Sequence, residues 1–263
     1  MIRNETTGDA VRRRGCVLDI ETAPDRHASI LAQRSKGAPT GSPLHEIVNV
    51  SVLEFVALPD GTLGEWMLNS YHRTEYAEAD ILANAEKALA ATVEDGGIIA
   101  TFNGRQFDLP MLRMRQLRWW QCAADAIPRI WAEEAEHLDL MIELSGHGLG
   151  RWPSLADACA SLGFSLRGPA RVGGGRTIPP ETEKCELDVV GTAILLHYVL
   201  AGRRFSDEPL RRGLPAFGRF VRALAERKSH LERFALSHLL MDDAGAWGAT
   251  ATCSASPPAR TGT

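Results

Sequence analysis

Four acidic residues stand in parts of the sequence that are otherwise apolar, and they are the first candidates for chemistry. Asp19 and Glu21 lie two residues apart in the strand-like segment VLDIE, so their side chains point to the same face of a strand. Asp108 follows the apolar segment IIATFN, and Asp188 lies inside the helical segment CELDVVGTAILL. Removing a carboxylate from water is costly unless a cation or hydrogen bonds compensate its charge. These four positions therefore need either a shared cation or separate local partners.

Each of the four has an ordinary structural explanation when it is taken alone. Asp19 and Glu21 could cap the end of a strand, and Asp188 could make a local hydrogen bond. Taken together, in this order and on these elements, the four acids are better explained by a divalent-metal site. Carboxylate oxygens are hard ligands that suit Mg²⁺ or Mn²⁺. Two such ions about 3.5–4 Å apart form a recurring device for phosphodiester cleavage, in which one activates a water and the other stabilises the leaving oxygen.

Hydrophobic periodicity places these acids on the elements of an α/β domain. Apolar and β-branched runs predict five strands, at 15–25, 47–58, 62–70, 98–103 and 137–141. Helical spacing predicts five helices, at 76–95, 108–120, 154–164, 182–201 and 215–240. Segments 26–46 and 165–181 carry Gly and Pro and are expected to be loops. The first three strands form a meander and the last two alternate with helices, so we expect a mixed five-stranded sheet flanked by helices.

The chain is expected to contain a single domain, because no linker divides the predicted elements. This domain spans residues 15–241. Residues 1–14 are polar and are expected to be a flexible N-terminus. Residues 242–263 are small, polar and without pattern, which predicts a disordered tail.

Composition and charge exclude several classes of protein. Of the 263 residues, 44% are hydrophobic and 24% are charged, which is typical of a globular chain. No apolar run approaches the roughly 20 residues of a membrane helix, so we expect no membrane association. The net charge of −4 excludes nucleic-acid binding through global basicity, but not through a local basic strip. The five scattered cysteines, never spaced as CxxC, argue against a disulfide framework or a zinc module and favour a reducing, cytoplasmic location.

Four segments resemble, in order, motifs of the DEDD superfamily of 3′–5′ exonucleases: VLDIETAPD, ATFNGRQFDLPML, EHLDLM and CELDVVGTAILL. In particular they resemble the predicted exonucleases related to the proofreading domain of family-B DNA polymerases, over residues 16–240. The resemblance implies an RNase H-like (DnaQ-like exonuclease) fold and two metal ions. It further implies that Asp19, Glu21 and Asp188 hold the water-activating ion. Asp19 would bridge to the second ion, which Asp108 would hold directly or through water.

The sequence departs from the family beside the last aspartate. Family members carry a tyrosine four residues before it, or a histidine five residues before it, which orients the attacking water. Lys184 and Glu183 occupy these positions here, and helical spacing places Lys184 beside Asp188. Three interpretations remain open. Lys184 could help to position hydroxide or phosphate, could mark an enzyme with weakened or absent activity, or could only neutralise the acidic cluster.

A second departure lies in segment 165–181. Family members usually have a short lysine-containing glycine turn there, whereas this chain has the sequence LRGPARVGGGRTIPP. Arg167, Arg171 and Arg176 could grip a nucleic-acid backbone, or they could belong to a solvated loop.

The strand exit before Asp108 carries the candidate substrate-binding residues. By resemblance, Asn103 and Gly104 shape the pocket for the terminal nucleotide, and Phe107 packs below it. The Asn-Gly pair could instead only close a loop. His137 and Asp139 match the family and are expected to make hydrogen bonds around the site rather than to bind a metal directly.

Two groups of basic residues could contact phosphate. Arg113, Arg115 and Arg118, with Trp119 and Trp120, suit phosphate contact and base stacking, although one Trp in the core with solvated arginines fits the spacing too. The predicted helix 215–240 carries a second group, which could be a nucleic-acid track or a solvated face. Its members are Arg219, Arg222, Arg227, Lys228 and Arg233.

These patterns predict an exonuclease that depends on two Mg²⁺ or Mn²⁺ ions and removes nucleotides from single-stranded 3′ ends. DNA is the expected substrate, and RNA stays open as the alternative. A repair or replication protein is an expected partner. Two alternatives stay open. One is an exonuclease-fold protein that binds nucleic acid without cleaving it, which Lys184 would explain, and the other is an interaction domain that reuses the fold.

Overall fold

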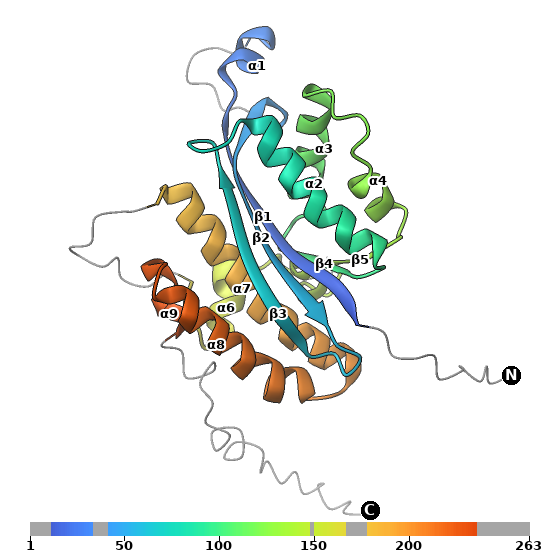
Figure 1. The fold of residues 1–263 in the computed structure, drawn as a ribbon, viewed down its shortest axis with the longest axis vertical. Helices are drawn as coiled ribbons and strands as arrows, with labels where there is room; N and C mark the ends of the chain where they lie inside the picture. The colour runs from blue at the N-terminus through green and yellow to red at the C-terminus, as the bar shows by residue number, and fades with distance from the viewer. Residues whose placement is uncertain (1–11, 34–41, 148–149, 167–177, 236–263) are drawn as a thin grey trace, which may run out of the picture.

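A five-stranded mixed sheet forms the centre of the molecule (Figure 1). The structure is a computed structural model and describes residues 12–33, 42–147, 150–166 and 178–235. The strands lie in the order β3-β2-β1-β4-β5. β1 pairs antiparallel with β2, and β2 with β3, whereas β4 runs parallel to both β1 and β5. Their bounds are Arg13–Pro24 (β1), His45–Ala57 (β2), Leu63–His72 (β3), Ile98–Thr101 (β4) and Glu136–Asp139 (β5).

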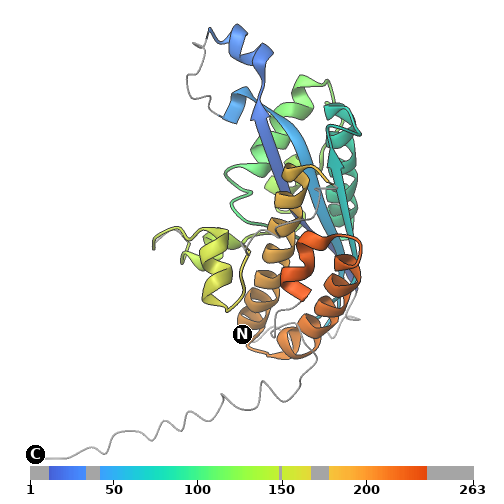
Figure 2. The same ribbon diagram turned by 90° about the vertical axis from the view of Figure 1, so that its left-hand side faces the viewer.

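Helices cover both faces of this sheet (Figure 1). One face carries α2 (Glu78–Glu94), α3 (Asp108–Arg118) and α4 (Ala126–Trp131), and the other carries α7 (Pro180–Arg204) and α8 (Leu214–Ala225). The view from the side shows α6 alongside α7 (Figure 2). The shorter helices are α1 (Arg26–Leu31), α5 (Leu140–Leu144), α6 (Leu155–Ser161) and α9 (Glu232–Ala235). The α/β class and the flanked, mixed five-stranded sheet are thus confirmed, in an arrangement consistent with an RNase H-like fold.

β1 divides its side chains between two hydrophobic cores because successive strand residues face opposite sides of a sheet. Cys16, Leu18 and Ile20 pack into the core beneath α2 and α3. Val17 belongs to the other core, beneath α7. Asp19 continues the series of Val17, so its side chain points toward α7.

All five predicted strands are present, and within the described residues three short α-helices, α1, α4 and α5, were not predicted. α1 lies in segment 26–46, which was expected to be a loop, and Asp25 caps it by accepting the N–H of Ala28 at 2.9 Å. α4 and α5 are too short for a repeating apolar pattern to reveal them. Residues 1–11 and 236–263 lie outside the described residues, so the predicted flexible terminus, disordered tail and domain limits stay predictions.

The continuous helix predicted for 215–240 is wrong. α8 ends at Ala225, and a short 3₁₀ turn, Ser229–Leu231, precedes α9. The chain leaves the helical conformation at Lys228, where φ is −127° and ψ is 79°. This break turns Lys228 and His230 toward Glu186 of α7, which both of them contact. An ion pair with a distant helix therefore overrides the local helical pattern.

α7 is the central helix of the α7-side core. By length and composition alone it could cross a membrane, since its most apolar 18-residue window has a mean hydropathy of 1.4. However, 78% of that window is buried inside the protein, as in the core helix of a globular fold. Its apolar character is thus accounted for by packing against the sheet and neighbouring helices.

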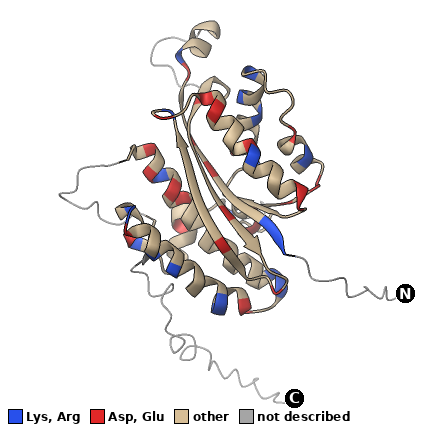
Figure 3. Ribbon diagram, in the orientation of Figure 1, with Lys and Arg blue, Asp and Glu red and all other residues tan. Residues whose placement is uncertain are grey.

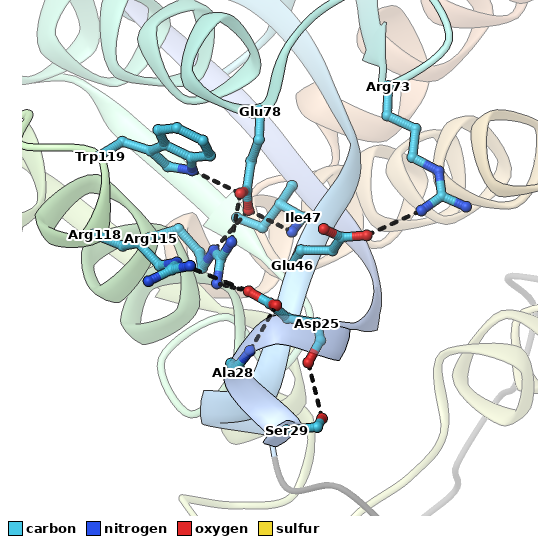
Figure 4. A network of polar contacts seen from close by, with 10 residues as sticks. All are labelled: Asp25, Ala28, Ser29, Glu46, Ile47, Arg73, Glu78, Arg115, Arg118 and Trp119. Carbon is cyan, nitrogen blue, oxygen red and sulfur yellow. Dashed lines mark hydrogen bonds and ion pairs between the residues drawn. The ribbon is translucent and has the colours of Figure 1, made fainter. Parts of the chain in front are cut away.

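A buried arginine ties four elements together at one end of the sheet (Figure 4). Arg115 of α3 donates to both carboxylate oxygens of Glu78, at 2.7 and 2.5 Å, and to Asp25 Oδ2 at 2.9 Å. Glu78, at the start of α2, also accepts the N–H of Ile47 and the indole N–H of Trp119, both at 2.7 Å. The network holds the starts of α1, β2 and α2 against the end of α3.

This network corrects the prediction that Arg115 contacts nucleic acid, whereas base stacking by Trp119 and Trp120 stays a prediction. Arg115 is buried and both of its partners are carboxylates of the protein, so it presents no charge to a phosphate. Arg113 donates to the carbonyl of Ala124 at 2.8 Å. The alternative, with one Trp in the core, is also wrong, because Trp119 is 45% and Trp120 is 88% exposed.

We predict that Arg115→Met lowers the free energy of unfolding by about 3–5 kcal/mol at pH 7, because it leaves Asp25 and Glu78 buried without their cation. Arg118→Met, one turn further along α3, is the matched control. Arg118 lies 3.8 Å from Asp25 and is partly exposed, so its loss should cost no more than about 1 kcal/mol. Urea unfolding of the three proteins measures both values. Equal losses would contradict the role given to Arg115.

The loss of stability in Arg115→Met should depend on pH, and the pKa of Asp25 gives its direction. Burial opposes ionisation of Asp25, but the N–H of Ala28 and the guanidinium of Arg115 outweigh it, so the pKa of Asp25 is lowered. Its contribution is therefore complete above the ordinary aspartate pKa of about 3.9 and is lost as the pH falls through the lower, folded-state value. The stability gap between the native protein and Arg115→Met should narrow below about pH 4.

Candidate metal centre

β1 and α7 bring three of the four predicted acids together. Asp19 and Glu21 project from the same face of β1, and Asp188 projects from α7, which packs against that face. One carboxylate oxygen from each residue lies within 4.8 Å of the other two. Acidic positions also gather on the N-terminal half of α7, as Figure 3 shows. Residues 169 positions apart in the sequence thus form one cluster of oxygen ligands.

The fourth acid, Asp108, lies beside this cluster and completes the edge of β1. β4 pairs with β1 only at residues 15–17, so the β4-side edge of β1 is open beyond Val17. Asp108, the first residue of α3, fills this opening, because its Oδ1 accepts the N–H of Ile20 at 3.1 Å. Asp108 is buried and is not one of the three residues within 4.8 Å of one another.

The surroundings of Asp19 and Asp108 disfavour the ionised form of both carboxyl groups. Burial, followed by the charges of Asp108 and Asp188, raises the pKa of Asp19 well above its ordinary value. Asp19 Oδ2 is buried without a hydrogen-bond partner. Burial also raises the pKa of Asp108 to about 7, despite the backbone N–H of Ile20. An all-oxygen set with an unpartnered buried oxygen fits a divalent cation, which would compensate the charge that the protein leaves uncompensated.

Lys184 lies against the acids, as its spacing from Asp188 predicted. Its Nζ contacts Glu21 Oε1 and lies 3.4 Å from Asp188 Oδ2. Partial burial lowers the pKa of Lys184, but the hydrogen bond to Glu21 and the charge of Asp188 outweigh it and raise the pKa. Lys184 therefore neutralises part of the cluster. A further role in positioning hydroxide or phosphate stays a prediction.

A cleft of about 570 Å³ opens beside the cluster. The first turns of α7, with Glu183, Lys184 and Asp188, form one wall, and the start of α6 forms another. Arg233 of α9 also lines it and donates to the carbonyl of Leu166 at 2.5 Å. The predicted arginines of segment 165–181, at positions 167, 171 and 176, lie outside the described residues.

Asp139 holds the segment that carries the predicted substrate-binding residues. Its two carboxylate oxygens accept the N–H groups of Asn103 and Arg105, each at 2.9 Å. Asp139 is also the N-cap of α5 and accepts the N–H of Met141 at 3.2 Å. Asn103 adopts a left-handed conformation with φ of 70°, and its Oδ1 is buried without a partner. The expectation that Asp139 acts through hydrogen bonds agrees with these contacts.

Packing and hydrogen bonds explain why the positions around Asn103 carry the residues that they do. A Cβ on Gly104 would lie 2.4 Å from Thr101 Cβ, so only glycine allows this close approach. Phe107 packs against the core beneath α2 and α3. His137 Nε2 lies 2.9 Å from Thr101 Oγ1, and burial lowers the pKa of His137 to about 4. A role of Asn103, Gly104 and Phe107 in binding nucleotide stays a prediction.

Lys228, predicted to belong to a nucleic-acid track or a solvated face, instead pairs with a buried glutamate. Its Nζ lies 2.7 Å from Glu186 Oε1, and His230 Nε2 lies 2.9 Å from Glu186 Oε2. Glu186 is fully buried and also accepts the hydroxyl of Ser70 at 2.6 Å. Burial raises the pKa of Glu186, but these hydrogen bonds outweigh it and lower the pKa. Lys228 is therefore a structural partner of α7 rather than part of a solvated face.

A polar seam beneath the site was not predicted. It runs from α7 across two strands through side-chain contacts of 2.6–3.2 Å and ends at Glu186. The signal that could have revealed it is the polar alternation of Asn49 and Ser51 within the apolar strand β2. The seam consists of Thr182, Asn49, Ser51, Ser70 and Glu186.

Comparisons with known proteins give a distant structural similarity. No protein-family model matches the chain, and no curated protein matches it. The fold is similar to part of a family B DNA polymerase from the hyperthermophilic archaeon Pyrobaculum calidifontis, with a TM-score of 0.43 and 12% sequence identity. The similarity covers 82% of this chain, which spans 29% of the polymerase chain.

We predict that Asp139→Ala lowers the free energy of unfolding by about 2–3 kcal/mol, because three N–H groups lose their acceptor. Ser154→Ala is the matched N-cap control, since Ser154 caps α6 through the single N–H of Asp157 and should cost about 1 kcal/mol. Hydrogen exchange at Asn103 and Arg105 should accelerate only in Asp139→Ala. Unchanged exchange there would contradict the anchoring role.

We further predict that Asp19→Asn stabilises the metal-free protein by about 1–3 kcal/mol at pH 7. The raised pKa of Asp19 means that the folded state disfavours the carboxylate that the unfolded state holds freely at this pH, and the amide removes that cost. Asp80→Asn, at an exposed position in the first turn of α2, should instead lower stability, by no more than about 1 kcal/mol, through the lost interaction with the helix dipole. Mn²⁺ should raise the melting temperature of the native protein and of Asp80→Asn, but not of Asp19→Asn, since binding to the folded state stabilises it. Equal shifts in all three would place the ion elsewhere.

Proposed function

We propose that this chain is a metal-dependent 3′–5′ exonuclease that removes nucleotides from single-stranded 3′ ends, with DNA as the expected substrate. The observation that carries the proposal is the cluster of Asp19, Glu21 and Asp188 within 4.8 Å, with one buried oxygen of Asp19 left without a partner. The order of the acidic motifs along the chain, which resembles that of the DEDD exonucleases, supports the same reaction.

The residues divide into metal-holding and nucleotide-holding groups. Asp19, Glu21 and Asp188 would hold one Mg²⁺ or Mn²⁺ ion, and Asp19 with Asp108 would hold a second. When bound, such ions supply activation of a water and stabilisation of the leaving oxygen. The hydrogen bond of Asp108 to Ile20 fixes its carboxylate against β1, next to Asp19.

The nucleotide-holding group is the segment that Asp139 anchors. We assign the pocket for the terminal nucleotide to Asn103, Gly104 and Phe107. The buried, unpartnered Oδ1 of Asn103 supports this assignment, since it is an acceptor that the protein itself does not use. Asp139 acts here as a positioning residue, because its carboxylate fixes the backbone of Asn103 and Arg105.

One observation favours a second candidate function. Lys184 lies where the resembling enzymes carry a tyrosine, and its ammonium is paired with Glu21 and Asp188. A protein whose acids are permanently neutralised in this way would bind nucleic acid without cleaving it. The two functions differ in whether degradation depends on Asp19.

Digestion of a 5′-labelled single strand tests the proposal. With Mg²⁺ or Mn²⁺ the native protein should produce a ladder that shortens from the 3′ end, and EDTA should abolish it. Asp19→Asn and Asp188→Asn should each slow the reaction by about a hundredfold or more, the scale on which loss of one preorganised electrostatic group slows an enzyme. Parallel DNA and RNA strands measure the substrate preference.

Asp80→Asn serves as the control for purification and charge, and it should digest the strand at the native rate. If the native protein and Asp19→Asn degrade the strand equally slowly, the exonuclease proposal is wrong. Retained binding to the strand in that case would favour the second function.

A further inference from the structure

Lys184 and the candidate metal ions compete for the same oxygens. The Lys184 ammonium contacts Glu21 and lies 3.4 Å from Asp188, and both acids belong to the cluster of three. Asp19, the third member, acts on the ammonium only through its charge, and its Oδ2 has no hydrogen-bond partner. The ammonium thus compensates two of the three carboxylates that a divalent cation would use.

We infer that Lys184 is the resident counter-cation of the candidate metal centre, and that a divalent ion binds there by displacing its ammonium from Glu21 and Asp188. The inference rests on the proposed metal centre. The ammonium already occupies the Glu21 and Asp188 oxygens that the ion would use, and its positive charge at contact distance repels the ion. Lys184 therefore lowers the affinity of the centre for metal and sets the metal concentration at which the centre fills.

The surroundings of Lys184 allow this displacement. Its side chain is 60% exposed, and it lines the open cleft beside the cluster. A lysine ammonium is a point charge on a flexible four-carbon stem, so it can move while its backbone stays in α7. The acids are less free, because Asp19 and Glu21 belong to a strand paired with β2, and Asp188 lies within a core helix.

The displaced ammonium remains near the centre. Glu183, the preceding residue of α7, lines the same cleft and offers a carboxylate there, although the positive charge of Arg233 lines it too. Lys184 therefore alternates between the acids and the cleft, depending on whether a divalent ion is bound. This behaviour differs from that of a tyrosine at the same position, which carries no positive charge to compete with the metal.

Direct titration with Mn²⁺, followed by the electron paramagnetic resonance signal of the free ion, tests the inference without an activity measurement. Lys184→Gln should bind Mn²⁺ about tenfold more tightly than the native protein, within the range usual for coupling between two binding events. Lys87→Gln, at an exposed position of α2, changes the net charge equally and should bind as the native protein does. Lys184→Arg keeps the charge and should also keep the native affinity.

The arms of the experiment separate failure of this inference from failure of the proposed centre. If Asp19→Asn binds Mn²⁺ as the native protein does, the proposed centre is wrong. If Asp19→Asn loses binding but Lys184→Gln binds no more tightly than the native protein, the centre stands and the competition is wrong. A gain of equal size in Lys184→Arg would also overturn the inference, since charge would not be its cause. Lys184→Met provides the same comparison if Lys184→Gln does not fold.

Discussion

The structure depends on how negative charge is compensated on the face of the sheet that α7 covers. β1 turns Asp19 and Glu21 toward α7, which adds Asp188, so three carboxylates meet where water is partly excluded. Desolvation and mutual repulsion both work against this arrangement. The fold holds the acids together nevertheless, because each is fixed by an element that the hydrophobic cores already position.

α7 is the element on which this positioning depends most. Its apolar residues fill the core beneath the sheet, and the polar seam from Thr182 to Glu186 fixes its rotation about its own axis. Lys228 and His230 then attach the C-terminal helices to the same glutamate. A helix held by both packing and directed hydrogen bonds presents Asp188 and Lys184 to β1 in one orientation.

Most of the sheet could be predicted from the sequence, because strand alternation and helical spacing are local properties. The convergence of Asp19, Glu21 and Asp188 is not a local property, and it was expected from the order of the acidic motifs, which resembles that of the DEDD exonucleases. Arg115 and Lys228 could not be predicted, since their partners lie 37 or more positions away and neither residue type indicates burial. The prediction of one continuous helix over 215–240 failed for the same reason, because a contact with the distant Glu186 overrides the local helical pattern. The short helices α4 and α5 carry too few residues to show a period.

Glu186 and Asp25 differ from Asp19 and Asp108 in how their charge is compensated, and the difference supports the interpretation of the cluster as a metal site. Glu186 and Asp25 each have cationic partners and backbone or hydroxyl donors, and the pKa of each is lowered. Asp19 and Asp108 lack a direct cationic partner among the described residues, and the pKa of each is raised. Arginine, lysine and histidine side chains compensate the structural carboxylates Asp25 and Glu186, whereas no such side chain pairs directly with Asp19 within the part of the chain that the structure describes. An Asp19 Oδ2 without a partner, beside a lysine that can move away, is the arrangement expected when the missing positive charge comes from a bound ion.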